Sequence, residues 1–306
     1  MLEERQRAFG WPIAVELWLS GAGCATFLIS FIFDLLGRCE LIARIGGILG
    51  PLLVGIGSVL LLVDLGCKSQ VYRLFYKVSS SWMSKGTWIL TFFVLLSLAY
   101  SVPALWIPWG AVFVSPSTKR PLPGVFCTVD IYPGFLFGVI KCIPVWNTPA
   151  LPPVFSLSSL YTGVAIVLLI ACLPLGILES EALLACHWLG IAGITLIVVQ
   201  LLALGAYVEI GRNSSVSFVK SVRLLRTPRL VGGALIVGLI VPLCVLSYSL
   251  AVNGEPVCSI LSSVAGVLML GGSLFLRHSI IKARVYLPIV LIGNKYYEGT
   301  LEWPGG

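Results

Sequence analysis

The stretch Trp11–Leu36 reads WPIAVELWLSGAGCATFLISFIFDLL, and its only charged residues are Glu16 and Asp34. About 20 apolar residues are enough for a helix to cross the hydrocarbon core of a bilayer. The stretch is longer than the apolar core of a secretion signal, and the three parts of such a signal do not occur in order. It therefore predicts a transmembrane helix.

The composition of the whole chain is that of a membrane protein. Of its 306 residues, 58% are hydrophobic and 11% are charged, whereas soluble proteins carry about 25% charged residues. Seven more apolar runs follow the first, so we predict an all-α membrane protein with eight transmembrane helices. The predicted spans cover residues 11–36, 44–65, 87–107, 125–143, 153–174, 183–207, 230–251 and 257–280.

A short internal similarity indicates how these helices are grouped. Val63-Asp64-Leu65-Gly66 closes the second span, and Val208-Glu209-Ile210-Gly211 closes the sixth, 145 residues later. An even number of spans in each half gives two repeats of the same orientation; chance similarity is the alternative. We expect two four-helix bundles, residues 1–150 and 151–285, then an interfacial segment and polar tail over residues 286–306.

The cations are distributed unevenly about the predicted spans. Eight spans place both termini, and the loops after spans two, four and six, on one side with sixteen of the 20 lysines and arginines, Arg277 included. By the positive-inside rule this basic face is cytoplasmic, in a prokaryotic cell membrane. The face also suits an acidic partner or anionic lipid, and both interpretations can hold. The cations that we expect to contact a partner are Lys68, Arg73, Lys77, Arg212 and Arg223.

The stretch Tyr132–Pro153, YPGFLFGVIKCIPVWNTPALPP, combines an apolar helix with a proline-broken loop. Irregular backbone at membrane depth is tolerated only where it is buried in protein or lines a cavity. Tyr132, Trp146 and Asn147 are therefore candidates for a binding site. For Tyr132 the alternative is an ordinary hydrogen bond between helices.

Glu16 is the strongest candidate for proton chemistry. A carboxylate inside a span should face the bundle interior and find a partner; the alternative is a hydrated acid at the interface. Glu16, Tyr132, Trp146 and Asn147, with Trp11 at the start of the first span, would form one pocket if spans one and four are neighbours. Aromatic and hydrogen-bonding groups suit a flat ligand with carbonyl groups, such as a quinone.

The histidines and cysteines argue against a metal centre. His187 begins the sixth span and His278 ends the eighth, so they lie about 30 Å apart, one bilayer thickness, and cannot ligate one haem. The nine cysteines include no CxxC pair, and an iron–sulfur cluster or zinc site needs clustered thiolates. We expect no metal in this chain. Any redox chemistry must then take its electrons from a partner protein. Asp130 and His187 are candidates for a proton route from the other face, with hydrated loop residues as the alternative.

Five short motifs, in order, resemble the NrfD/polysulfide reductase family of haem-free, quinone-reactive membrane subunits. They are GWPIAVEL at 10–17 with GAG at 21–23, VDLG at 63–66, SWMSKGTW at 81–88, YPGFL at 132–136 and PVWNTP at 144–149. The resemblance covers residues 9 to 293. It implies eight helices in two bundles, and a quinone or menaquinone site near the docking face of a four-cluster ferredoxin-like subunit.

The resemblance also implies roles and partners. The ferredoxin-like subunit would relay electrons to or from a molybdopterin subunit, and Glu16 and Tyr132 would line the quinone site. Better-known relatives carry their catalytic subunits outside the cytoplasmic membrane, whereas the cation bias here makes the docking face cytoplasmic. We expect a subunit of an oxidoreductase complex, not a complete enzyme. The alternatives are a secondary transporter or proton-translocating subunit and a purely structural anchor.

Overall fold

A computed structural model describes residues 11–64, 82–106, 146, 148–172, 180–212, 229–251, 255–282, 290–292 and 295–297. The described part is helical except for a few turn residues and one pair of short strands. The helices are α1 (Trp11–Leu35), α2 (Glu40–Asp64), α4 (Trp82–Trp106), α8 (Leu151–Ala171), α9 (Ser180–Arg212), the π-helical η3 (Arg229–Ile240) with its continuation α11 (Val241–Ala251), and α12 (Glu255–Lys282). Strand β1 (Val290–Ile292) pairs antiparallel with β2 (Lys295–Tyr297).

The all-α membrane prediction is confirmed for the body of the protein. Seven of the predicted spans coincide with described helices, if η3 and α11 are taken as one. Six of these helices are long and apolar enough to cross a bilayer. The predicted fourth span, 125–143, lies outside the described residues, so the count of eight and the two four-helix bundles stay predictions. Strand β1 falls in the segment expected at the interface.

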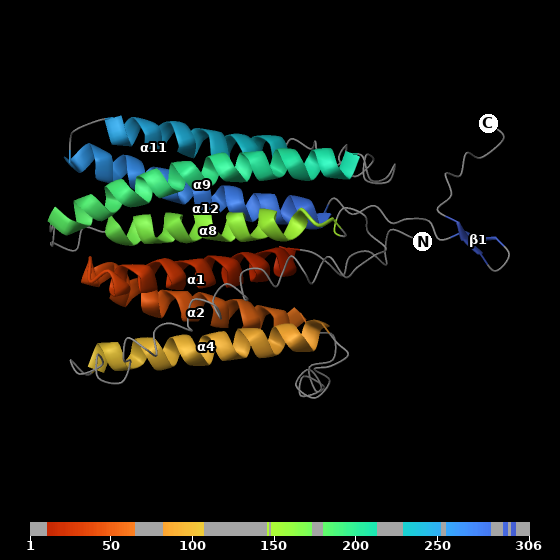
Figure 1. Ribbon diagram of the computed structural model, residues 1–306, viewed down its shortest axis with the longest axis horizontal. Coiled ribbons are helices and arrows are strands. Elements are labelled where there is room, and N and C mark those ends of the chain that lie inside the picture. The colour runs from red at the N-terminus through yellow and green to blue at the C-terminus, as the bar shows by residue number, and fades with distance from the viewer. Residues whose placement is uncertain are drawn as a thin grey trace.

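The helices lie side by side with their long axes nearly parallel (Figure 1). Helices α1, α2 and α4 pack in sequence as one group, and α8, α9, η3–α11 and α12 pack together as a second. Helix α1 joins the groups, because it contacts α8 and α12 as well as α2. Helix α1 begins, and α12 ends, at the right-hand end of the array.

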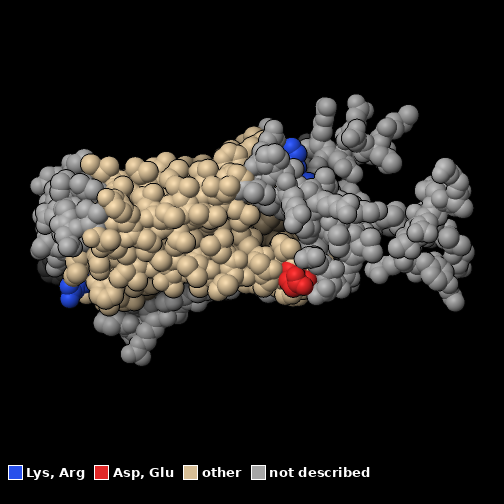
Figure 2. Space-filling view, turned by 90° about the horizontal axis from the view of Figure 1, so that it is seen from above, with Lys and Arg blue, Asp and Glu red and all other residues tan. Residues whose placement is uncertain are grey.

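The surface of the array is apolar. Leu95, Leu202 and Ile260 each expose more than half of their area, and the described charges in Figure 2 lie towards the two ends of the tan body. Soluble monomers rarely expose apolar patches of more than a few hundred Å². This surface therefore fits contact with lipid along the body and water at the ends.

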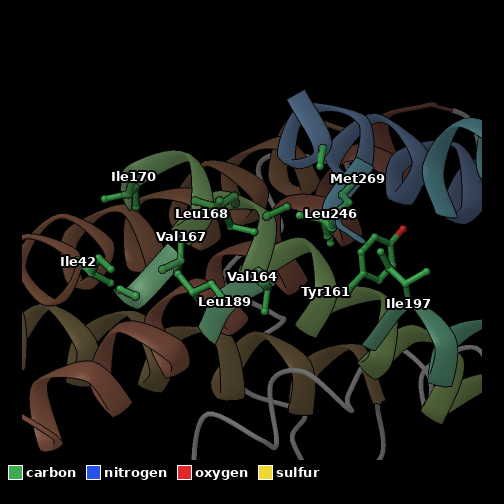
Figure 3. Close-up of a cluster of buried hydrophobic side chains, with 14 of the residues drawn as sticks. Ile42, Tyr161, Val164, Val167, Leu168, Ile170, Leu189, Ile197, Leu246 and Met269 are labelled. Atoms are coloured by element: carbon green, nitrogen blue, oxygen red, sulfur yellow. The ribbon is translucent and has the colours of Figure 1, made fainter. Parts of the chain in front are cut away.

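The largest buried cluster lies where α8 meets its neighbours (Figure 3). Tyr161 and Val164 of α8 pack with Ile197 of α9, Leu246 of α11 and Met269 of α12. At a second contact, the backbones of η3 and α12 touch: a Cβ on Gly272 would lie 2.0 Å from the Cα of Gly238. Close backbone approach at small residues is how helices associate in lipid, where burial of apolar area gives little drive.

One buried cation connects the two groups of helices. Arg277 of α12 is only 1% exposed. Its guanidinium donates to the Leu17 carbonyl of α1, to Ser159 Oγ of α8 at 2.6 Å and, at 3.5 Å, to the Phe155 carbonyl. It also lies 5.8 Å from the centroid of the Phe155 ring. A charge at this depth requires such partners, so α1, α8 and α12 meet around it.

This position corrects the assignment of Arg277 to the basic face. The expectation was that an arginine near the end of a span extends to the interface, which long side chains commonly do. Arg277 turns inward instead, because α1 and α8 present three acceptors there. Gly21 of α1 leaves the necessary room: a Cβ at this position would lie 2.6 Å from Arg277 Nη2.

Replacing Gly21 by valine tests this packing. A Cβ there would also lie 2.3 Å from Ser159 Oγ, so we expect overpacking to lower the free energy of unfolding by roughly 1–3 kcal/mol. Equilibrium unfolding in detergent measures the loss. Gly205→Val in α9 is the matched control, because a Cβ there meets no atom within 4 Å; it should change stability by less than about 0.5 kcal/mol. Equal losses in the two variants would contradict the packing argument.

Candidate functional site

Glu16 lies in the interior of the array, near the end at which α1 begins. Its side chain is 6% exposed. Ser20, one turn further along α1, donates to Glu16 Oε1 at 3.4 Å, and the Arg277 guanidinium interacts with the carboxyl electrostatically. A buried carboxyl needs such partners, a hydroxyl donor and a nearby cation, to carry a negative charge there.

Further polar groups lie close to Arg277, on α1, α8 and α12. Trp18 of α1 donates its indole N–H to Ser273 Oγ of α12 at 2.6 Å. Tyr161 of α8 is fully buried, and its phenol lies within electrostatic range of Arg277. Hydroxyls, a carboxyl, a phenol and a guanidinium therefore gather at one three-helix junction. We call Glu16, Ser20, Ser159, Tyr161, Ser273 and Arg277 the polar junction.

An aromatic pair lies at the same end of α1 and α12. The rings of Trp11 and His278 are stacked, with centroids 3.8 Å apart and planes 11° from parallel. His278 is buried, whereas Trp11 is 48% exposed. His278 follows Arg277 directly in α12, so the pair adjoins the polar junction. Trp11 thus has one ring face covered by His278 and part of its surface open.

Trp146 is a buried anchor between the segment before α8 and the end of α12. Its side chain is 1% exposed, and its indole N–H donates to the Ile280 carbonyl at 3.2 Å. It packs in one cluster with Ala14 and Leu17 of α1. These two residues flank Glu16, so the structure brings Trp146 and Glu16 to the same region, although they are 130 positions apart in the sequence.

Other predicted site residues lie elsewhere or outside the described part. His187 is exposed in the first turns of α9, and His278 lies in the last turns of α12. Both helices begin at the left-hand end of Figure 1, so the two histidines lie towards opposite ends, as predicted. The residues outside the described part are Tyr132, Asn147, Asp130, Lys68, Arg73, Lys77 and Arg223; the backbone of Arg212 ends α9, and its side chain is not described.

Among the described residues, no three histidine, cysteine, aspartate or glutamate side chains are placed to hold a metal ion. The expected absence of haem and clusters stays a prediction, because several cysteines lie outside the described part.

The sequence did not predict most of the polar junction. Arg277 was expected at the surface, and Ser159 and Tyr161 were not predicted to be site residues. The role of Arg277 could have been predicted from the sequence, because it lies inside the apolar run 257–280 and ionisable residues inside spans usually mark function. Serines in apolar helices carry no comparable signal, since they commonly bond to the carbonyl of the preceding turn. Ser159 does so too, donating to the Phe155 carbonyl at 3.1 Å.

Comparison with known proteins identifies the family of this protein. A family model described as "Polysulphide reductase, NrfD" matches residues 2–287. The C subunit of polysulfide reductase from Wolinella succinogenes is 30% identical over 197 positions, which cover 54% of the present sequence and 59% of that relative. The match therefore spans less than two thirds of the relative's length. The family match covers almost the whole sequence, as the motifs predicted, and the protein belongs to the NrfD polysulphide reductase family.

Proposed function

We propose that this protein is the membrane subunit of an oxidoreductase complex that exchanges electrons between a membrane quinone and a docked iron–sulfur subunit. Family membership supports a membrane subunit of such a complex. The observation that carries the quinone proposal is the buried Glu16 carboxyl in the polar junction. It offers the proton exchange that quinone chemistry requires, at the end of the array that holds the aromatic pair.

The reaction requires a proton acceptor and an electron acceptor. Oxidation of one quinol to a quinone releases two electrons and two protons. Because we expect no redox centre in this protein, an iron–sulfur cluster of the partner would accept the two electrons. Glu16, as general base, accepts the first proton from the quinol and passes it to water before it accepts the second, and Tyr132 donates a hydrogen bond to a quinone carbonyl. In the opposite direction Glu16 supplies the two protons in turn, and Tyr132 keeps its hydrogen bond to the carbonyl.

The polar junction supports Glu16 in this role. Arg277 compensates the negative charge that Glu16 carries after deprotonation, and Ser20 holds one carboxyl oxygen. Trp11, half-exposed and stacked on His278, contributes an aromatic surface for the flat ring. Trp146 fixes the segment that leads from Tyr132 and Asn147 towards α8.

The basic face provides the docking surface for the iron–sulfur subunit, and a molybdopterin subunit completes the complex. Lys68, Arg73 and Lys77 follow α2, Arg212 is the last residue of α9, and Arg223 follows α9. The ends of α2 and α9 lie at the same end of the array as the start of α1 (Figure 1). Without Arg277 the face keeps fifteen of the 20 cations, so the positive-inside rule still favours a cytoplasmic orientation.

The packing also suggests how the two halves correspond. Helices α1 and α2 pack as an antiparallel pair that opens the first half, and α8 and α9 do the same in the second. We propose that residues 125–143 complete a first four-helix bundle within residues 1–150. The second bundle then covers residues 151–285.

Glu16→Gln tests the proton role. We expect quinol oxidation by the assembled complex to fall roughly 100-fold, since general acid–base groups contribute at least that much. The amide is nearly isosteric, so complex assembly and unfolding should stay unchanged. Tyr132→Phe should raise KM for the quinol more than it lowers kcat, because it removes a hydrogen bond to the bound substrate.

Glu40→Gln is the matched control for the carboxylate. Glu40 begins α2 at the other end of the array, is exposed and pairs only with Arg44, one turn along the same helix, in the described part. Such surface pairs contribute little to stability. If the Glu16→Gln variant turned over at the wild-type rate, Glu16 would have no part in the mechanism. Substrate uptake by the isolated protein in liposomes, with no quinone activity in the complex, would favour a transporter instead.

The docking proposal predicts a charge effect. The double variant Lys68→Glu/Lys77→Glu should bind the iron–sulfur subunit roughly tenfold more weakly at low salt, and the difference should shrink as ionic strength rises. Co-purification and binding measurements in detergent check this. Arg38→Glu, an exposed site at the opposite end of the array, is the control and should bind normally. Equal weakening by both variants would contradict docking at the basic face.

A further inference from the structure

The end of the array opposite Glu16 gathers thiols from four segments. Cys172 follows the last residue of α8, Cys186 lies near the start of α9, and Cys258 lies near the start of α12. Cys39 precedes α2. The thiols of Cys39, Cys172 and Cys258 all lie within electrostatic range of Cys186. They are scattered over the sequence, with no two closer than fourteen positions.

Two of these thiols are in direct contact. The Sγ atoms of Cys172 and Cys186 are 3.6 Å apart. They lie at the adjoining ends of α8 and α9, which are antiparallel and pack against each other. Cys258 has a different neighbour, because its Sγ lies 3.2 Å from Ser249 Oγ of α11. Among the described thiols, Cys172 and Cys186 therefore form the pair placed for covalent chemistry.

We propose that Cys172 and Cys186 form a disulfide site, which covalently joins the end of α8 to the start of α9 when a disulfide donor is present. The thiolate of one cysteine attacks the donor disulfide and releases one donor thiol. The second cysteine then attacks this mixed disulfide and releases the other. Two protein thiols are oxidised to one disulfide, and the donor disulfide is reduced to two thiols.

In the orientation proposed above, this site lies on the side of the membrane where disulfides can form. This end carries few of the cations, and the positive-inside rule places it outside the cytoplasm, where disulfides form and persist. Cys172 is also partly exposed at the end of its helix. The bond closes the loop between residues 172 and 186, fourteen positions apart. The bond would stabilise the folded protein by restricting this loop in the unfolded state.

The test uses the full-length protein in its native membranes. Membranes are treated with oxidised glutathione, free thiols are blocked with N-ethylmaleimide, and proteolytic peptides are analysed by mass spectrometry. We expect one linked peptide pair that joins Cys172 to Cys186 and disappears after reduction. Cys172→Ser and Cys186→Ser should each lose it. Cys244→Ser, at an exposed position on α11, should retain it.

Stability gives a second measurement. The oxidised wild-type protein should unfold at a higher temperature than the reduced protein, and this difference should vanish in Cys186→Ser. The proposal is overturned if both thiols are alkylated after oxidation, or if Cys186 is linked to Cys258 or Cys39 instead. The wild-type measurements decide the question even if a serine variant fails to fold. They are independent of the quinone assay, so the two proposals can fail separately.

Discussion

The buried guanidinium of Arg277 is the constraint on which the described arrangement depends. A cation in an apolar span must find acceptors inside the protein, and here those acceptors belong to α1 and α8. The three helices come from both groups of the array, so satisfying one charge also defines how the groups meet. Gly21 follows from the same requirement, because any side chain at that position would occupy the space of the guanidinium. Packing in lipid offers no comparable directional force.

The same charge organises the proposed site. Burying the Glu16 carboxyl costs free energy, and the interactions with Arg277 and Ser20 offset part of this cost. The polar junction, the stacked Trp11–His278 pair and buried Trp146 all lie towards the end of the array where α1 begins. The opposite end holds the four thiols, together with the exposed ion pair of Glu40 and Arg44. The proposed proton exchange and the proposed disulfide are thus separated by the length of the helices.

The sequence predicted some of these features well and others poorly, for physical reasons. The interior position of Glu16 was expected from the cost of a carboxylate in lipid, which is a property of one residue. The inward turn of Arg277 was not, since either direction is allowed for a long side chain and the choice depends on acceptors supplied by other helices. The cysteines were interpreted as scattered because no local spacing linked them, yet Cys172 and Cys186 meet at 3.6 Å.

By itself the sequence determined that this is a membrane protein, the approximate ends of seven described helices and the family. These depend on the hydropathy and length of local runs, or on short motifs. Only the tertiary structure decided which side chains meet, such as Arg277 with Ser159, Trp11 with His278 and Cys172 with Cys186. The reason is that a helix in lipid is apolar on nearly every face. Its pattern therefore does not show which face turns towards a neighbour and which towards the bilayer.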